Sequence, residues 1–239
     1  MYKQRTKEVS NIPLIVLCGG RGTRLAPVLP DCPKILAPLG TETLLDILMK
    51  EWHRAGLHHI ILSVGYLKEH IKEHVARKQY AVRFSEEKEP LGTGGALAHA
   101  IKLTNEKRLF VTNGDMLFTP DWEALYRFHR RTGKTASLYM ARAYAGNGGT
   151  VITVNREGTI TSWREKQAAD QPEHIYLNAG AYCIEASIAR FFPHRQQFSF
   201  EQDVLSHLVP HALSGLKTDA PFLDIGTPER YTLAKKERL

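Results

Sequence analysis

A short apolar run at residues 12–18 ends at a glycine-rich turn, and this junction constrains the fold more than any other part of the chain. An apolar run of this length, rich in β-branched residues, predicts a buried strand. Three of residues 19–22 are glycines, which tolerate positive φ and let backbone N–H groups approach a ligand closely. Arg24 and Lys34 follow, and both carry donors suited to phosphate oxygens. The stretch therefore predicts a strand that leads directly into a polyphosphate site.

Two familiar phosphate-binding fingerprints do not fit this turn. A Walker A loop places Lys-Ser or Lys-Thr after its last glycine, and a dinucleotide fingerprint needs a third glycine where this chain has Leu25. Pro27 and Pro30 also prevent a long helix from starting directly after the turn. An ordinary glycine-rich βα turn would explain a lone Gly-x-Gly, but the added Thr-Arg pair and the neighbours Pro33 and Lys34 favour phosphate binding.

Strand-like and helix-like segments alternate through the first 132 residues. The expected strands lie at residues 12–18, 59–64, 80–84 and 109–112, and the expected helices at 43–55, 67–77 and the end of the glycine loop at 86–100. Such alternation is typical of βαβ units, which build a mostly parallel sheet with helices on both faces.

The second half of the chain is richer in strand-like runs. The expected strands lie at residues 135–141, 150–154, 160–163, 174–184 and 221–225, with short helices near 187–191 and 200–208 and a terminal helix at 228–236. Residues 156–158 predict a hairpin turn. The sequence contains no repeat or linker, so we expect a polar arm at residues 1–11 and one domain with a mixed sheet at 12–239. The pattern does not determine the order of the strands.

The composition limits the class of protein. A chain of 239 residues with 43% hydrophobic and 24% charged residues is typical of a globular protein with a sizeable core. Three cysteines without Cys-x-x-Cys spacing argue against disulfides and a structural zinc site. The sequence has no apolar stretch long enough to span a membrane, and residues 1–11 lack the apolar centre of a signal peptide. We therefore expect a cytoplasmic protein with no membrane partner.

The net charge of +7 indicates an anionic partner or a basic solvated surface. The basic residues are scattered, and the sequence has no helix-turn-helix, RNP or zinc-finger pattern, so we do not expect a nucleic-acid partner. Small phosphorylated substrates and a solvated surface both explain the charge, which does not decide between them.

Two aspartates, Asp115 and Asp224, each end a short apolar strand. Ligands of open α/β sheets bind beyond the carboxyl ends of the strands, where the two side chains can converge. Mg²⁺ prefers one or two carboxylates together with substrate phosphates, and we expect this ion as the cofactor. A turn or a helix N-cap would also explain either aspartate alone. The glycine turn in the same chain favours the metal site.

Several short motifs follow one another along the chain. They are LCGGRGTRL, Pro33-Lys34, EPLGTGGA, NGD, Glu165-Lys166, the NAG of residues 178–180 and DIGT. This order resembles that of the nucleotide-sugar pyrophosphorylases, which are sugar-1-phosphate nucleotidyltransferases, and the resemblance covers nearly the whole chain. Within that family the chain is most similar to the D-glycero-D-manno-heptose 1-phosphate guanylyltransferases. The resemblance implies a Rossmann-like three-layer α/β/α sandwich with a mixed, mostly parallel central sheet.

The resemblance also implies an activity and the residues that carry it. The activity joins GTP and a sugar 1-phosphate to give a GDP-sugar, a precursor for polysaccharide synthesis, and pyrophosphate. The implied catalytic residues are Arg24, Lys34 and Asp115, and the implied metal ligands are Asp115 and Asp224. The implied nucleotide contacts are Leu17, Gly19, Gly20, Gly22, Thr23, Glu87, Pro90, Gly92 and Thr93. The implied sugar-phosphate contacts are Gly149, Glu165, Lys166 and Asn178.

The acidic run before Pro90 bears on the nucleobase. By the resemblance this loop lies beside the base, and Glu87 matches the base-contacting position. Guanine offers two adjacent donors on its Watson–Crick edge, which one carboxylate can accept together, whereas uracil and thymine offer one donor between two carbonyl groups. The pattern thus predicts a preference for GTP. A solvated acidic run at Glu87 and Glu89 is the alternative.

Several alternatives accompany this interpretation. Ile35 and Gln167 stand where the family usually has a proline after each lysine. Mannose 1-phosphate, another nucleobase or a non-catalytic nucleotide-sugar-binding subunit are other interpretations. A dinucleotide-dependent oxidoreductase would need an acidic residue on the next strand, but Glu42 precedes the first helix instead. The chain is expected to lack the C-terminal β-helix of longer relatives, and a homodimer is one expected assembly.

Overall fold

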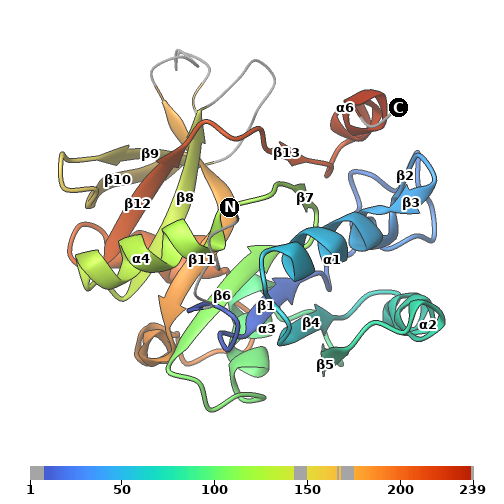
Figure 1. Ribbon diagram of the computed structural model, residues 1–239, viewed down its shortest axis with the longest axis horizontal. Coiled ribbons are helices and arrows are strands. Elements are labelled where there is room, and N and C mark those ends of the chain that lie inside the picture. The colour runs from blue at the N-terminus through green and yellow to red at the C-terminus, as the bar shows by residue number, and fades with distance from the viewer. Residues whose placement is uncertain (1–7, 143–149, 166, 168–174, 238–239) are drawn as a thin grey trace, which may run out of the picture.

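The computed structural model describes residues 8–142, 150–165, 167 and 175–237. Its main element is a nine-stranded mixed sheet in which β10, β9, β11, β6, β1, β4 and β5 follow one another, with β8 beside β11 and β12 beside β8 (Figure 1). The strands are β1 (Leu14–Leu17), β4 (Ile60–Val64), β5 (Val82–Glu86), β6 (Arg108–Asn113), β8 (Ala136–Arg142), β9 (Thr150–Val154), β10 (Ile160–Glu165), β11 (Tyr176–Glu185) and β12 (Leu213–Thr218).

The part of the sheet formed by the first half of the chain is parallel. β1 lies between β4 and β6 and pairs in parallel with both, and β4 pairs in parallel with β5. The connections carry three helices, α1 (Leu44–Arg54), α2 (Lys68–Lys78) and α3 (Gly92–Ile101). This arrangement confirms the βαβ units predicted from the alternating pattern. It also places the carboxyl ends of four strands at one edge of the sheet.

The second half of the chain extends this sheet in antiparallel fashion. β11 pairs antiparallel with β6, β8 and β9, whereas β12 pairs in parallel with β8. β9 and β10 form the predicted hairpin, whose turn is held because the Asn155 side chain accepts the N–H groups of Glu157 and Thr159. Helix α4 (Trp122–Thr132) begins at Asp121, whose side chain accepts the N–H of Ala124.

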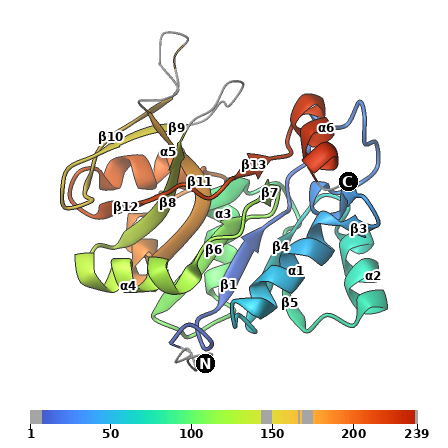
Figure 2. The same cartoon turned by 45° about the horizontal axis from the view of Figure 1, so that its top comes forward.

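Helices cover both faces of the sheet, and the alternation of side chains along β1 shows why (Figure 2). Leu14 and Val16 point into a core that includes residues of α1, α2 and α4. Ile15 points to the opposite face, into a core with residues of α3 and the short helix α5 (Phe200–Asp203). All three side chains are fully buried. The expected Rossmann-like α/β/α sandwich is therefore confirmed.

The C-terminal part differs from the sequence prediction. The strand expected at residues 221–225 is only β13 (Leu223–Asp224), which pairs with β7 (Met116–Leu117) outside the main sheet. The helix expected at residues 200–208 is divided into α5 and a 3-10 turn at Leu205–Leu208. The last helix, α6 (Pro228–Glu237), lies near β13, as both views show.

Strand β12 was not predicted, because Ser214 and Gly215 interrupt its apolar pattern. The glycine is required by packing, since a Cβ atom at this position would lie 2.4 Å from the Met140 sulfur on the neighbouring strand. Near the other end, Val9 is 4% exposed and belongs to the core, so the described part of the expected polar arm packs on the domain. None of the helices in the described ranges is long and apolar enough to cross a membrane.

Candidate active site

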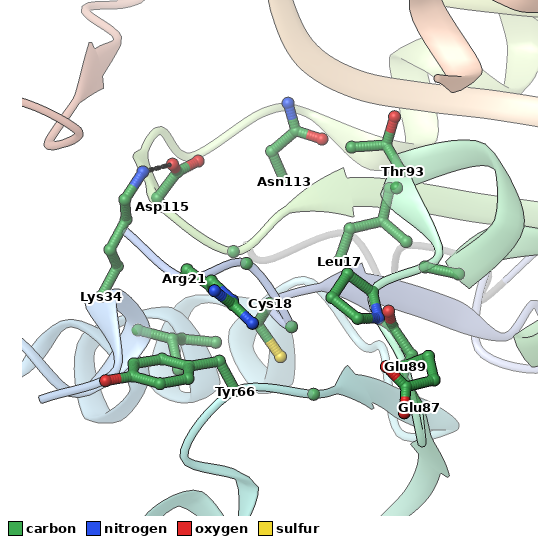
Figure 3. Close-up of a pocket in the computed structure, with 18 of the residues that line it drawn as sticks. Leu17, Cys18, Arg21, Lys34, Tyr66, Glu87, Glu89, Thr93, Asn113 and Asp115 are labelled. Atoms are coloured by element: carbon green, nitrogen blue, oxygen red, sulfur yellow. Dashed lines mark hydrogen bonds and ion pairs between the residues drawn. The ribbon is translucent and has the colours of Figure 1, made fainter. Parts of the chain in front are cut away.

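A cavity of about 540 Å³ opens at the carboxyl ends of the parallel strands (Figure 3). β1 brings Leu17 to it, the turn after β4 brings Tyr66, the loop after β5 brings Glu87, and the turn after β6 brings Asp115. The floor is therefore made by four parallel strands, which is the place where open α/β sheets bind ligands.

The structure brings together most of the residues that the sequence implied for the nucleotide. Those that line the cavity are Leu17, Gly19, Gly20, Lys34, Glu87, Pro90, Gly92, Thr93 and Asp115. The described residues that do not line it are Gly22, Thr23, Arg24, Glu165, Asn178 and Asp224. Two implied sugar-phosphate contacts, Gly149 and Lys166, lie outside the described residues.

The glycine turn approaches its neighbours closely. A Cβ atom on Gly19 would lie 2.5 Å from Glu87 Oε1 and 3.0 Å from the Gly65 nitrogen, so a larger residue would have to displace the Glu87 carboxylate. Gly22 has a φ of +65°, and its carbonyl accepts the N–H groups of Leu25 and Ala26 at 2.9 and 3.1 Å. The chain reverses at this point, which turns residue 25 into the core.

The arginine that lines the cavity is Arg21, which the sequence analysis did not select. Arg24, two residues beyond Gly22, is exposed. Arg21 stands between two of the turn glycines, and its guanidinium lies across the middle of the cavity (Figure 3). Arg24 was selected through the resemblance, and its contact with the triphosphate stays a prediction.

Lys34 and Asp115 form an ion pair at the cavity wall. Lys34 Nζ donates to Asp115 Oδ2 at 2.8 Å, and the two side chains are 19% and 29% exposed. The lysine begins a 3-10 turn at Lys34–Leu36, and its methylene groups pass Gly22, where a Cβ atom would lie 3.2 Å from Lys34 Cγ. The aspartate follows β6 directly. Two segments far apart in sequence thus place opposite charges side by side.

Strand β13 places Asp224 beside the segment that carries Asp115, although Asp224 does not itself line the cavity. Asp224 pairs with Met116, and the N–H of Ile225 donates to the Asp115 carbonyl at 3.0 Å. Asp224 Oδ1 accepts the N–H of Gly226, and Oδ2 accepts from Arg230 of α6 at 2.5 Å. A Cβ atom on Gly226 would lie 2.6 Å from Asp224 Oδ1 and 3.2 Å from Lys34 Nζ, so this glycine lies between the aspartate and the lysine.

The donor set at this wall fits a divalent cation that is completed by a ligand. The described residues contain no cluster of three or more acidic, histidine or cysteine side chains that could hold a metal alone. Asp115 and Asp224 are two carboxylates joined through adjacent backbone, and each has a cationic partner in Lys34 and Arg230. Mg²⁺ is commonly held by one or two carboxylates together with substrate phosphates. The chemistry of the donors therefore suits such an ion.

Glu87 is buried at the inner end of the cavity, with 9% of its surface exposed. Oε2 accepts the N–H of Leu91 at 3.0 Å, and Oε1 lies against Gly19. Burial raises the pKa of this carboxyl above its ordinary value, and the hydrogen bond from the Leu91 N–H lowers the pKa by a smaller amount. The side chain thus holds the loop before α3 as well as lining the site. Glu89, the alternative in the same run, is exposed and also lines the cavity.

Close packing explains the glycines at the start of α3, and this explanation was not evident from the sequence. A Cβ atom on Gly92 would lie 2.5 Å from the Phe198 carbonyl oxygen, one on Gly94 would lie 2.3 Å from the Phe198 ring, and one on Gly95 would lie 2.2 Å from the Gln196 carbonyl oxygen. The N–H of Gly94 donates to the Phe198 carbonyl at 2.9 Å. These glycines let residues 196–200 dock against α3, and Gln197 of that segment lines the cavity.

Asn113 is a further lining residue that was not selected from the sequence. Its side chain lies between Asp115 and Thr93 in the close-up (Figure 3). The buried Oδ1 atom accepts no hydrogen bond from the described residues. Buried polar atoms without a partner are rare, which makes this side chain a candidate ligand contact.

Of the sugar-side residues, Glu165 and Asn178 are described. Asn178 lies on β11, where its Oδ1 accepts the N–H of Gly180 and its Nδ2 donates to the Tyr182 hydroxyl. Glu165 ends β10, is exposed and accepts from Gln202 at 3.3 Å. Both residues belong to the antiparallel part of the sheet, apart from the nucleotide-lining strands.

Comparison with known proteins assigns the chain to a family. Residues 14–239 match the family described as Nucleotidyl transferase. The chain is 32% identical over 228 residues to the D-glycero-alpha-D-manno-heptose 1-phosphate guanylyltransferase of Aneurinibacillus thermoaerophilus, covering 93% of this chain and 96% of that protein. It is 28% identical to the mannose-1-phosphate guanylyltransferase of Mycobacterium tuberculosis, covering 92% of this chain but only 62% of the relative.

A solved structure supports the same assignment. The crystal structure of HddC from Yersinia pseudotuberculosis is similar, with a TM-score of 0.82, 28% identity and coverage of 95% of this chain and 99% of that one. A second structure of HddC, complexed with GMP-PN, gives a TM-score of 0.81 at 29% identity. The fold, the phosphate-binding turn and these matches agree, and the chain belongs to the nucleotidyl transferase family.

Proposed function

We propose that the protein transfers a guanylyl group from GTP to a sugar 1-phosphate, giving a GDP-sugar and pyrophosphate. The observation that carries this proposal is the ion pair of Lys34 and Asp115 at the cavity wall, with Asp224 on the strand next to Asp115, beside a glycine turn at the carboxyl ends of parallel strands. It combines cations for phosphate oxygens with carboxylates for a metal. Two relatives that are similar along nearly their whole length are heptose 1-phosphate guanylyltransferases, and this supports both the base and the sugar.

In the proposed reaction a phosphate oxygen of the sugar 1-phosphate attacks the α-phosphorus of GTP. The new bond joins that oxygen to the α-phosphorus, the bond from the α-phosphorus to the bridging oxygen breaks, and pyrophosphate leaves with the electron pair. A phosphate monoester is already an anionic nucleophile at neutral pH, so the side chains need not remove a proton. Positioning and charge neutralisation then account for most of the rate.

The lining residues divide this work. Gly19 and Gly20 let the backbone approach the phosphates, and Arg21 and Lys34 neutralise the charge of the triphosphate and of the departing pyrophosphate. Arg24, which does not line the cavity, stays a predicted contact of the triphosphate. Nucleotidyl transferases generally use a divalent metal. We propose Mg²⁺ held by Asp115 and Asp224, where it would draw negative charge from the phosphate oxygens.

Glu87 is our candidate for the guanine edge. Its Oε1 atom is free of hydrogen bonds from the described residues, whereas Oε2 already accepts the Leu91 N–H. A bidentate contact with guanine would therefore share Oε2 with the loop backbone. On the sugar side, Asn178 and Glu165 are the described candidates, and Gly149 and Lys166 stay predictions.

The sugar is proposed to be D-glycero-D-manno-heptose 1-phosphate, with mannose 1-phosphate as the alternative supported by the second group of relatives. All three cysteines are free thiols, which supports a reducing compartment, and we propose the cytoplasm. A homodimer stays a prediction.

Pyrophosphate release tests the proposal. Four nucleoside triphosphates are combined with heptose, mannose, glucose and N-acetylglucosamine 1-phosphates, and the initial rates are compared. We expect the highest kcat/KM with GTP and a manno-configured sugar 1-phosphate. A preference for UTP or dTTP would replace the guanylyl assignment, and no turnover with any pair would exclude the enzymatic function.

A further inference from the structure

A cluster of hydrogen bonds joins the nucleotide side of the cavity to the sugar-side strand β11. At its centre is the carboxylate of Glu201 in the short helix α5. Its Oε2 atom accepts from Thr93 Oγ1 at 2.7 Å and from Ser199 Oγ at 3.2 Å. Its Oε1 atom accepts from the Tyr182 hydroxyl at 3.4 Å. Thr93 lies 108 residues away in the sequence, so the carboxylate links two distant segments.

The direction of each hydrogen bond on the β11 side is fixed by the donors available. Asn178 Nδ2 can only donate, and it donates to the Tyr182 oxygen at 2.7 Å. The tyrosine's own proton is then directed to Glu201. Asn178 Oδ1 accepts the N–H of Gly180 at 3.0 Å, so both ends of the amide are oriented. One of the two Nδ2 hydrogens is used in this way, and the second has no acceptor among the described residues, so a ligand can take it.

Tyr182 is held rigidly between Asn178 and Glu201. It is fully buried and packs edge-to-face against Phe200 at a ring-centroid distance of 5.4 Å. Burial, followed by the nearby charge of Glu201, raises the pKa of this hydroxyl well above its ordinary value. The group therefore stays protonated at neutral pH and donates to the carboxylate.

On the nucleotide side of the cluster, the direction of the Thr93 hydrogen bond is also determined. Its hydroxyl accepts the N–H of Phe200 at 2.9 Å, so its single proton points to Glu201. Thr93 is the second residue of α3 and lines the cavity. The same carboxylate thus holds a cavity-lining residue and, through Tyr182, the amide of Asn178.

We propose that Glu201 is a positioning residue that aligns the nucleotide-binding start of α3 with the sugar-binding side chain of Asn178. The proposal rests on the proposed function, since it concerns the geometry between the two substrates. Glu201 is not among the residues that line the cavity, so it acts through Thr93 and Tyr182. In-line transfer requires the attacking oxygen and the α-phosphorus to be aligned, and small displacements of either substrate are costly.

The variant Glu201→Gln tests this role with little change in shape. A glutamine turns one acceptor atom into a donor, so it cannot accept from both Thr93 and Tyr182. We expect kcat/KM for GTP and for the sugar 1-phosphate to fall together, each by about tenfold or more. Steady-state kinetics with each substrate varied in turn measures both values.

A second variant separates the two arms of the cluster. Tyr182→Phe removes the hydroxyl between Asn178 and Glu201 but leaves the contact from Thr93 to Glu201 intact. We expect the KM for the sugar 1-phosphate to rise while the KM for GTP stays unchanged. Because this variant removes a single atom, it keeps the proposal testable if Glu201→Gln fails to fold.

Glu185→Gln is the matched control. Glu185 ends the same strand β11 and accepts from Arg108 and His129, but it does not line the cavity. We expect this variant to lower the melting temperature without changing either KM. Equal kinetic changes in both glutamine variants, a loss of stability without kinetic change in Glu201→Gln, or a raised GTP KM in Tyr182→Phe would overturn the proposal. An inactive wild-type protein would instead point to failure of the proposed function.

Discussion

The carboxylate at the cavity wall, Asp115, and the neighbouring carboxylate, Asp224, each have a cationic partner. Asp115 accepts from Lys34, and Asp224 accepts from Arg230. All four side chains are between 19% and 29% exposed, so these pairs are partly screened by water and contribute modestly to stability. Their main consequence is electrostatic balance, since the wall presents neither an excess of negative charge that would repel a triphosphate nor an excess of positive charge that would repel a metal.

If the two aspartates hold the metal, their charge should matter for turnover. We expect Asp115→Asn and Asp224→Asn each to lower kcat by about a hundredfold with the fold retained, because less charge on the reacting phosphate is neutralised. The measurement is steady-state kcat together with the melting temperature. Asp219→Asn is the control, since its side chain is 91% exposed and pairs only with Arg142 in the described ranges. Near-normal rates in both variants, or undiminished turnover in excess chelator, would contradict the assignment.

The two arginines of the glycine turn should differ in the kinetic constant that they affect. Arg21 already lines the cavity, so its contact exists when GTP binds, and we expect Arg21→Ala to raise the KM for GTP. Arg24 does not line the cavity, so we expect Arg24→Ala to lower kcat instead, with little change in the KM for GTP. Each variant serves as the control for the other. Identical kinetic changes in the two variants would contradict the expectation that the two arginines act at different steps.

At the scale of elements, the docking of residues 196–200 on α3 shapes the cavity. This segment carries Gln197 into the lining and sets Glu201 beside Thr93. The approach is possible only because the first turn of α3 is rich in glycine. The glycine-rich motif could be recognised in the sequence, but the packing that requires glycine there could not. The segment that contacts these glycines lies about a hundred residues away and has no recognisable sequence pattern.

Adding a side chain to this interface should be costly. In Gly94→Ala the new Cβ atom would lie 2.3 Å from the Phe198 ring, so the segment must move. We expect the free energy of unfolding to fall by about 1–3 kcal/mol, as for other overpacked sites. Urea denaturation measures this change. Gly20→Ala is the control because a Cβ atom at that position would meet nothing within 4 Å, and an equal loss of stability in both variants would refute the packing explanation.

At the scale of the whole molecule, the two halves of the chain differ in how far the sequence determines them. The βαβ units were predictable because β1 pairs with β4, and β4 with β5, each through one connecting helix. The pairing of β6 with β1 is less local, because α3 joins β6 to β5. The position of β11 between β6 and both β8 and β9 could not be predicted, because its antiparallel pairings depend on contacts distant in sequence. For the same reason the cavity-lining glycines, Lys34 and Asp115 could be named in advance, whereas the network around Glu201 could not.

A buried cluster away from the cavity joins α1, α2 and the segment before β5. Asp46 is 2% exposed and accepts from His74 Nε2 at 2.8 Å and from the Tyr80 hydroxyl at 2.7 Å. Arg77 can only donate to His74 Nδ1, which fixes the ring with its proton on Nε2. Burial alone would raise the pKa of Asp46, but the hydrogen bonds from Tyr80, His74 and Thr43 hold it well below its ordinary value.

This cluster should make the stability of the whole protein sensitive to acid. A carboxylate with a depressed pKa stabilises the fold above its unfolded-state pKa of about 3.9, and the contribution is lost as the pH falls through the lower folded-state value. We expect Asp46→Asn to be less stable than wild type at pH 7 and the difference to shrink below pH about 4. Urea unfolding from pH 7 to 3 measures it, with Asp219→Asn as the exposed control. A difference that does not vary with pH would exclude the charge as its source.

The pairing of β13 with β7 has a consequence for the order in which the protein becomes active during its synthesis. The parallel strands, the glycine turn and Asp115 are all translated before β13. Asp224 emerges about a hundred residues later, which corresponds to roughly 5–20 s at typical translation rates. The carboxylate pair of Asp115 and Asp224 is therefore complete only after β13 has been translated and has paired with β7.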